Sequence, residues 1–99
     1  MLDRFVAGTV SKDGDVTSGN GFSVNKTADG VYEVTFDGPS FPTAPTVTAN
    51  MYSADKGTII YGFITVYTAG PREFRIHTQS STGGWADTAF SFIAAGSSS

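Results

Sequence analysis

GFSVNKTADGVYEVTFDG, residues 21–38, is the clearest indication of a fold in this 99-residue chain. Phe22 and Val24 alternate with polar residues in 22–26, Tyr32, Val34 and Phe36 do so in 31–37, and the Asp29-Gly30 step lies between the two segments. Alternation with a period of two is typical of β-strands that bury one face, and Asp-Gly favours the positive-φ turn of a hairpin. We therefore predict that residues 22–26 and 31–37 pair antiparallel.

The same strand-and-turn pattern continues to the end of the chain. Three prolines within residues 38–45 predict a crossing loop, because proline cannot donate a hydrogen bond to a β-ladder. A strand is expected directly after Pro45, and residues 53–57 are expected to form a polar turn. The further predicted strands are 58–68, bent or bulged at Gly62, and 74–79, which forms the last hairpin with 85–95.

Short strands with one buried face each predict an all-β fold. We expect a single antiparallel β-sandwich of six to seven strands, without significant helix, over residues 1–99. Residues 10–21 contain few apolar side chains and are expected to form an exposed loop. Residues 96–99 are expected to be a frayed, flexible tail.

Composition excludes several classes of protein. Without cysteine the chain has no disulfide and no thiolate metal site. A net charge of −3 with only six scattered Lys and Arg residues argues against nucleic-acid binding. No basic leader with an apolar run and no window of about 18 apolar residues occurs, so we expect neither a signal peptide nor membrane insertion.

The sequence gives little support to a catalytic function. His77 is the single imidazole, and alternation places it on an outward face between Arg75 and Gln79, as an ordinary solvated side chain. No G-x-S-x-G motif accompanies it, and the acidic pair Glu33 and Asp37 flanks one strand. We therefore expect no enzyme and no catalytic residue.

A metal site is also not expected. In DGDVTSGNG, residues 13–21, the side chains of Asp13, Asp15 and Asn20 offer oxygen ligands as in the start of a calcium loop. Ser18 stands where the glycine of such a loop belongs, and no glutamate closes it. A plain loop without metal or cofactor is the favoured interpretation.

Binding surfaces remain as the functional hypothesis. Trp85, the only tryptophan, lies near polar side chains, and an indole packs well on the apolar face of a sugar ring. Two structural alternatives stay open: Trp85 could cover one end of the sandwich, or it could pack against a second subunit together with Phe63 or Tyr67. The candidate ligand-binding residues are Trp85, Asp87, Gln79, Arg75, Ser81 and Thr82.

A family resemblance covers roughly residues 22–95. YEVTFDGPSFPTAPTVTANMY (32–52), a long apolar strand and FRIHTQSSTGGWADTAFSFIAAG (74–96) together resemble H-type lectin domains and related small β-sandwich modules at the ends of bacteriophage tail fibres. The resemblance implies a trimer with binding sites at one end. It also implies sugar contacts from an aromatic residue and a histidine in the closing loop, where this chain has Ser81 and Thr82.

From the residues and the resemblance together we expect a non-enzymatic attachment or receptor-binding module. It would act as a homo-oligomer, with a trimer favoured, on a virion or extracellular surface, and would bind a glycan or a protein receptor. One alternative is a structural decoration or assembly protein of a virion that binds no receptor. Another is an adapter that binds a protein through an exposed sheet edge.

Overall fold

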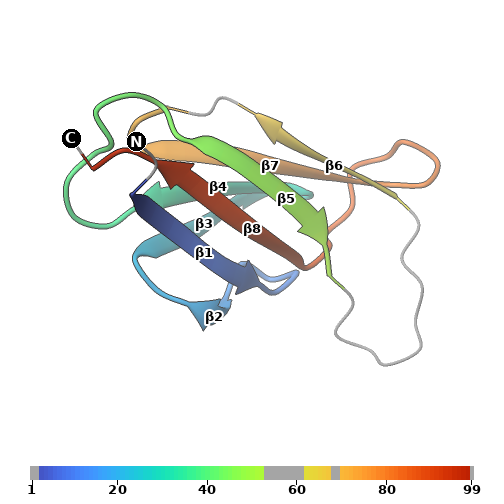
Figure 1. Cartoon of the computed structure of the whole chain (residues 1–99). Coiled ribbons are helices and arrows are strands. Elements are labelled where there is room, and N and C mark those ends of the chain that lie inside the picture. The colour runs from blue at the N-terminus through green and yellow to red at the C-terminus, as the bar shows by residue number, and fades with distance from the viewer. Residues whose placement is uncertain (1–2, 53–61, 68–69, 99) are drawn as a thin grey trace.

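The computed structural model describes residues 3–52, 62–67 and 70–98. Its strands are β1 (Arg4–Val10), β2 (Val16–Gly19), β3 (Phe22–Ala28), β4 (Val31–Phe36), β5 (Thr46–Met51), β6 (Gly62–Tyr67), β7 (Glu73–Ser80) and β8 (Phe90–Gly96). Sheet A has the order β2-β1-β8-β5 and sheet B the order β3-β4-β7-β6, both antiparallel (Figure 1). The described residues contain no helix. The predicted all-β sandwich is confirmed, with eight strands in place of six to seven.

The hairpin predicted over residues 22–37 is confirmed. Phe22 pairs with Phe36 and Val24 with Val34, so the apolar side chains of both strands face the same core. Gly30 takes the turn at a φ of +69°, where an L side chain is strained. A Cβ at Gly30 would also lie 2.4 Å from the carbonyl oxygen of Thr78, so this position requires glycine on two grounds.

The loop predicted over residues 10–21 is replaced by a turn and a strand, although residues 12–13 and 15–20 are exposed as predicted. Val10 is fully buried at the end of β1, and residues 16–19 form β2, which pairs with β1. The hydroxyl of Ser11 accepts hydrogen bonds from the backbone N–H groups of Asp13 and Asp15, which closes the turn between the strands. Every residue of β2 is exposed, so this edge strand lacks the alternation by which a half-buried strand is recognised.

The crossing predicted over residues 38–45 is confirmed, because the chain passes there from β4 in sheet B to β5 in sheet A. Phe41 inserts its side chain into the core from this loop. Arg4 covers Phe41, with its guanidinium carbon 4.3 Å from the ring centre, and donates a hydrogen bond of 2.7 Å to the carbonyl of Pro39. The loop is thus held against the start of β1.

The last hairpin, predicted between residues 74–79 and 85–95, is wrong beyond its tip. β7 pairs with β4 and β6, whereas β8 pairs with β1 and β5 in the other sheet. Only the bridge between Gln79 and Trp85 keeps the hairpin pattern. After Trp85 the chain crosses to sheet A, and the strand begins at Phe90 rather than at residue 85.

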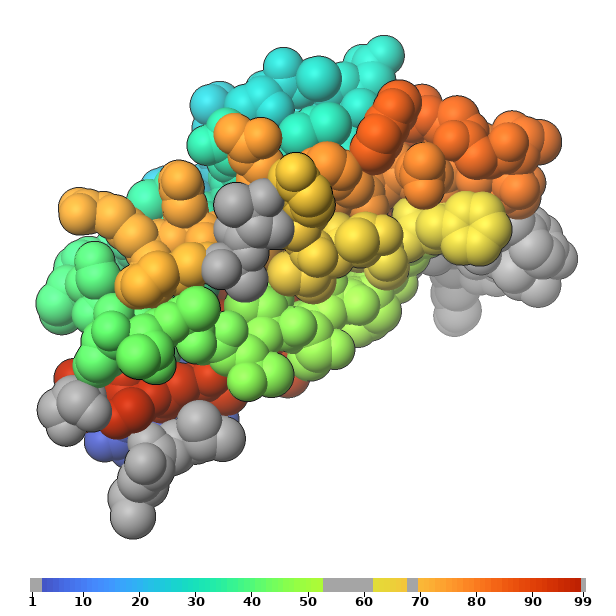
Figure 2. Space-filling view, turned by 90° about the horizontal axis from the view of Figure 1, so that it is seen from above, coloured from blue at the N-terminus to red at the C-terminus, as the bar shows by residue number. Residues whose placement is uncertain are grey.

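The strand predicted over residues 58–68 is described only from Gly62 to Tyr67, where it forms β6. Its remaining residues, and the turn predicted over 53–57, lie outside the described residues. β6 adjoins β5 along one side of the sandwich, as Figure 2 shows in yellow and green.

The tail predicted to fray from residue 96 is also wrong at its start. Gly96 is buried at the end of β8, and a Cβ there would lie 2.7 Å from the ring of Phe41. The backbone N–H and the hydroxyl of Ser98 both donate to the carboxylate of Asp3 at 2.7 Å. These hydrogen bonds lower the pKa of Asp3 and tie the two ends of the described chain together.

The core lies between the sheets and is dominated by aromatic rings. The ring of Phe22 meets that of Phe92 edge to face at 4.9 Å, and Tyr32 meets Phe90 at 5.1 Å. The hydroxyl of Tyr32 donates a hydrogen bond of 2.6 Å to the carbonyl of Lys12 in the β1–β2 turn. Burial, followed by the nearby negative charge of Asp87, raises the pKa of Tyr32 to about 12.

Candidate functional site

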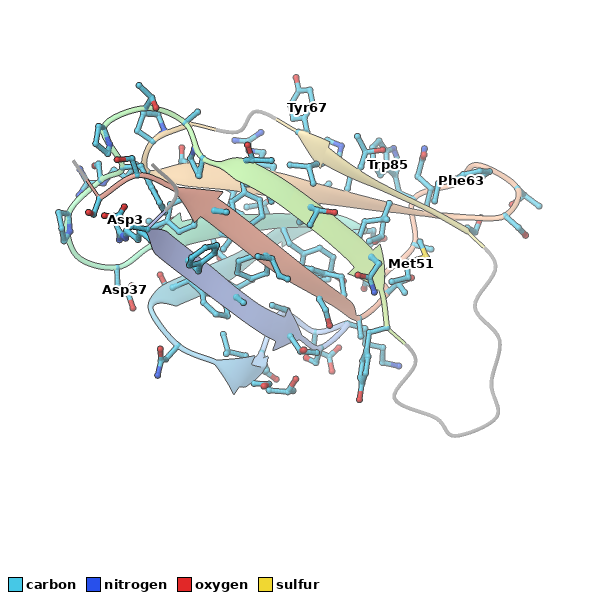
Figure 3. All side chains as sticks on the ribbon, viewed as in Figure 1. Asp3, Asp37, Met51, Phe63, Tyr67 and Trp85 are labelled. Carbon is cyan, nitrogen blue, oxygen red and sulfur yellow. The ribbon has the colours of Figure 1, made fainter. Side chains whose placement is uncertain are left out.

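Four rings gather on the outer face of sheet B, on the side away from the core. On β6, Phe63 and Tyr67 alternate with residues that pack against the core, so their side chains point outward. His77 on β7 and Trp85 in the loop after β7 complete the group. We call these four residues the aromatic cluster, and Figure 3 labels three of its members.

His77 lies between two rings of the cluster. Its ring centre is 4.8 Å from that of Tyr67 and 5.0 Å from that of Trp85, which it meets edge to face. The Nε2 atom of His77 is shielded from solvent, and none of the described residues forms a hydrogen bond with it. His77 thus packs between two rings of the cluster, and its interpretation as an ordinary solvated side chain is wrong.

The other three rings remain open to solvent. Phe63 is 56% exposed, and Tyr67 and Trp85 are each 52% exposed. Most large apolar side chains of the described residues lie in the core, so three exposed rings on one face form a patch of the kind that marks a binding surface.

Backbone hydrogen bonds fix the loop that carries Trp85. Ser80 and Gly84 pair through an N–H···O bond of 2.8 Å, which closes a short turn after β7. Beyond Trp85, the backbone N–H of Ala86 donates to the carbonyl of Thr78. The buried hydroxyl of Thr78 donates in return to the carbonyl of Ala86 at 2.5 Å. Trp85 is therefore held at a fixed place beside the end of β7.

Asp87 contributes to this loop by holding its backbone. One carboxylate oxygen accepts a hydrogen bond of 2.8 Å from the N–H of Gly30, in the turn between β3 and β4. The other lies 3.2 Å from the ammonium of Lys26. Both oxygens of this predicted ligand residue are thus engaged inside the protein, and Asp87 connects the Trp85 loop to the β3–β4 turn.

Arg75 and Gln79, two other predicted ligand residues, lie on β7 on the same outward face as His77. Arg75 forms an ion pair with Glu33 on β4 at 3.4 Å, and Glu33 stands directly opposite it in the sheet. The side-chain amide of Gln79 donates to the carbonyl of Gly83 at 3.1 Å, and Gln79 pairs with Phe63 across the sheet. Both residues border the aromatic cluster, so hydrogen-bonding groups lie beside its rings.

Ser81 and Thr82, the last two predicted ligand residues, are exposed at the tip of the turn after β7. The hydroxyl of Thr82 shares a hydrogen bond of 2.9 Å with that of Ser80. The structure thus places Trp85 in the aromatic cluster, Arg75 and Gln79 beside it, and Ser81 and Thr82 at the tip of the turn after β7.

Phe63, Tyr67 and His77 belong to the cluster but not to the candidate ligand residues predicted from the sequence. Alternation gives their outward orientation, but their grouping depends on the register between β6 and β7. In that register Thr65 stands opposite His77, and Tyr67 stands two pairs further on, opposite Arg75. The segment between these strands contains no residue pair that specifies this register, so the sequence offers no signal for it.

The loop considered for calcium has a different structure. Asp13 lies in the β1–β2 turn, and Asn20 follows the far end of β2. Within the described part of the chain, no group of three or more His, Asp or Glu side chains could hold a metal ion. Residues 3–52, 62–67 and 70–98 also contain no helix long and apolar enough to cross a membrane.

Comparison of the chain with protein-family models, curated proteins and solved structures finds no match. The resemblance to H-type lectins and phage tail-fibre modules therefore stays a prediction. Any functional argument must start from the aromatic cluster itself.

Proposed function

We propose that this protein is a non-enzymatic carbohydrate-binding module that attaches to glycans through the aromatic cluster on sheet B. The observation that carries the proposal is Trp85, which is half exposed and yet held in place by backbone hydrogen bonds and by His77. A ring that is already ordered loses little entropy when a sugar packs against it. Pyranose rings present C–H groups to such a surface and hydroxyls to its polar border.

The polar border favours neutral sugars. The guanidinium of Arg75 already has the carboxylate of Glu33 as its partner, so their charges offset each other beside the cluster. Glu73 adds a further negative charge at the start of the same strand. A sialylated or sulfated glycan would have to compete with Glu33 for Arg75, whereas neutral hydroxyls can bond to the ion pair as it stands.

The biological setting of the module is part of the same proposal. It rests on the resemblance to phage tail-fibre and H-type lectin domains, which implies attachment at a virion or extracellular surface by a homo-oligomer. A protein receptor is the other class of ligand for the same cluster. The alternative role as a decoration or assembly protein would leave the cluster without a soluble ligand.

A glycan array followed by calorimetry tests the proposal. We expect neutral glycans among the ligands, and Trp85→Ala should weaken their binding by roughly tenfold or more, since stacking and burial of the indole are both lost. Tyr52→Ala is the matched control, because Tyr52 is similarly exposed, at 47%, but directly follows β5 of sheet A. An array without hits, or equal affinities for the two variants, would contradict the proposal.

A further inference from the structure

The outer face of sheet A has an unusual composition. Its outward residues alternate along β1, β8 and β5 with residues that face the core. We define the sheet A face as Phe5, Ala7, Thr9, Ser91, Ile93, Ala95, Thr46, Thr48 and Asn50. None of these nine side chains carries a charge. Figure 1 views the molecule from this side.

Large and small side chains form a checkerboard at the centre of the sheet A face. Phe5 on β1 stands opposite Ala95 on β8, and two residues further along β1 Ala7 stands opposite Ile93. Phe5 is 64% exposed and Ile93 51% exposed, so both project beyond the alanines next to them. Each row thus contains one projection and one depression, in alternating order.

We propose that two copies of this chain pair face to face through the sheet A face, related by a twofold axis that lies in the interface. An axis parallel to the strands and midway between β1 and β8 exchanges the two positions of each row. It therefore places Phe5 of one copy over Ala95 of the other, and Ile93 over Ala7. The checkerboard is self-complementary under this operation, as an isologous contact requires.

The charges of the protein support a second copy as the partner. The chain has a net charge of −3, and a face that meets its own copy must not repel itself. The sheet A face satisfies this condition because it carries no charge, and depletion of charge around apolar anchors is typical of interface cores. Arg4 also belongs to β1, but it is not part of the sheet A face, and its guanidinium donates to the carbonyls of Asp37 and Pro39.

The size of the face sets the expected strength of pairing. The four strands of sheet A, which lie about 4.8 Å apart and are four to seven residues long, cover roughly 400 Å² per copy, or roughly 800 Å² in total. This is at the small end of specific interfaces, so we expect a dissociation constant on the order of 10–100 μM. Pairing should therefore depend on concentration.

Sedimentation of the full chain from about 1 μM to about 1 mM tests the proposal. The wild-type protein should shift from one chain to two, and Ile93→Lys should weaken this association at least about tenfold. Thr48 stands opposite Ile93 on β5. Thr48→Lys should also weaken the association, and it does so without removing an apolar side chain. Asn25→Lys is the matched control, since it adds the same charge at an exposed position of β3 in sheet B.

Mixed variants test the twofold register itself. Ile93→Lys and Ala7→Glu should each be monomeric alone, and their equimolar mixture should form a heterodimer because the introduced charges meet across the axis. A wild-type monomer at about 1 mM, a trimer, or association that survives both lysine variants at the sheet A face would overturn the proposal.

The pairing is independent of glycan binding, and the two can fail separately. Sheet A and sheet B face opposite sides of the sandwich, so a pair formed through sheet A leaves both aromatic clusters accessible. Trp85→Ala should leave the dimer unchanged, and Ile93→Lys should leave the affinity of a single site for a glycan unchanged.

Discussion

The two outer faces of this sandwich differ in what they offer a partner. The face of sheet B combines exposed rings with an Arg75–Glu33 ion pair and an amide, which is a mixed surface suited to a ligand rich in hydroxyls. The face of sheet A is uncharged, with Phe5 and Ile93 projecting between alanines, which suits a flat protein surface. The two proposals accordingly assign a ligand to one side of the domain and a second copy to the other.

The two faces also differ in the contacts that fix their shape. The sheet A face consists of regular strand positions, so its shape depends on the ladders of β1, β8 and β5. The aromatic cluster depends in addition on a loop, which Thr78, Gly30 and Asp87 attach to sheet B. Changes in these attachments should therefore affect glycan binding before they affect pairing.

The largest effect is expected for Gly30→Ala. An added Cβ would overlap the carbonyl of Thr78 and stand near the backbone of Ala86, and the residue would be strained at its φ of +69°. We expect a loss of about 3 kcal/mol in the free energy of unfolding, with displacement of Trp85 and loss of glycan binding. Denaturant unfolding and calorimetry would measure both.

Gly38→Ala is the control for this prediction. Gly38 has a similar φ of +75°, but no atom lies within 4 Å of the point where a Cβ would stand, so only the backbone strain of about 1 kcal/mol should appear. Equal destabilisation by the two variants would show that the contact with Thr78 does not matter.

Alkaline pH should act on both faces together, because it acts on the core between them. The pKa of Tyr32 is about 12 in the folded protein and 10.0 as its ordinary value, so the folded state holds the proton more tightly. The stabilisation is complete below pH 10 and is lost as pH rises through 12, by up to about 2 kcal/mol after screening by solvent near the β1–β2 turn. Unfolding curves between pH 8 and pH 12.5, about the range set by these values, would measure it.

Tyr32→Phe separates this effect from the titration of the other tyrosines. The variant lacks the hydrogen bond to Lys12 and should be less stable at neutral pH by about 1–3 kcal/mol, since that carbonyl loses its donor. It should also lose most of the stability change above pH 10. An unchanged alkaline profile would contradict the role of Tyr32.

The contrast between β3–β4 and β7–β8 explains how much of the fold was predictable. Alternation and an Asp-Gly turn specify both the strands and the pairing of β3 with β4. Alternation also identifies β7 and β8, but it is the same for strands that pair and for strands that face each other across a core. The sequence therefore predicts which residues are buried and leaves the sheet to which β8 belongs undetermined.

The same limit applies to the candidate site and to the missed strands. Trp85 was identified because a single tryptophan is visible in any sequence, whereas its contact with His77 depends on the loop after β7. No strand is predicted at β1, because Gly8 interrupts the alternation of its apolar residues. Glycine is required there because a Cβ would overlap the ring of Phe22. β2 escaped because all of its residues are exposed.

A moderate effect confined to sheet B is expected at His77. His77→Ala removes the ring that separates Tyr67 from Trp85, and we expect roughly fivefold to tenfold weaker glycan binding. His77→Phe keeps a ring there and removes the enclosed Nε2, so it should retain binding and gain up to about 1 kcal/mol in stability. Loss of binding in both variants would mean that an imidazole nitrogen contacts the ligand.

The smallest effect is expected for Asp87→Asn, which distinguishes a ligand contact from a contact that positions the loop. The amide oxygen of Asn can still accept from the N–H of Gly30, and only the partly exposed ion pair with Lys26 is lost, so stability should fall by about 0.5 kcal/mol. Glycan affinity should then match that of the wild type.

Asp87→Ala removes the acceptor as well and should weaken binding through a looser Trp85 loop. If instead Asp87→Asn alone weakened binding as much as Asp87→Ala, the carboxylate itself would contact the sugar, and the cluster would include the acidic residue first expected from the sequence.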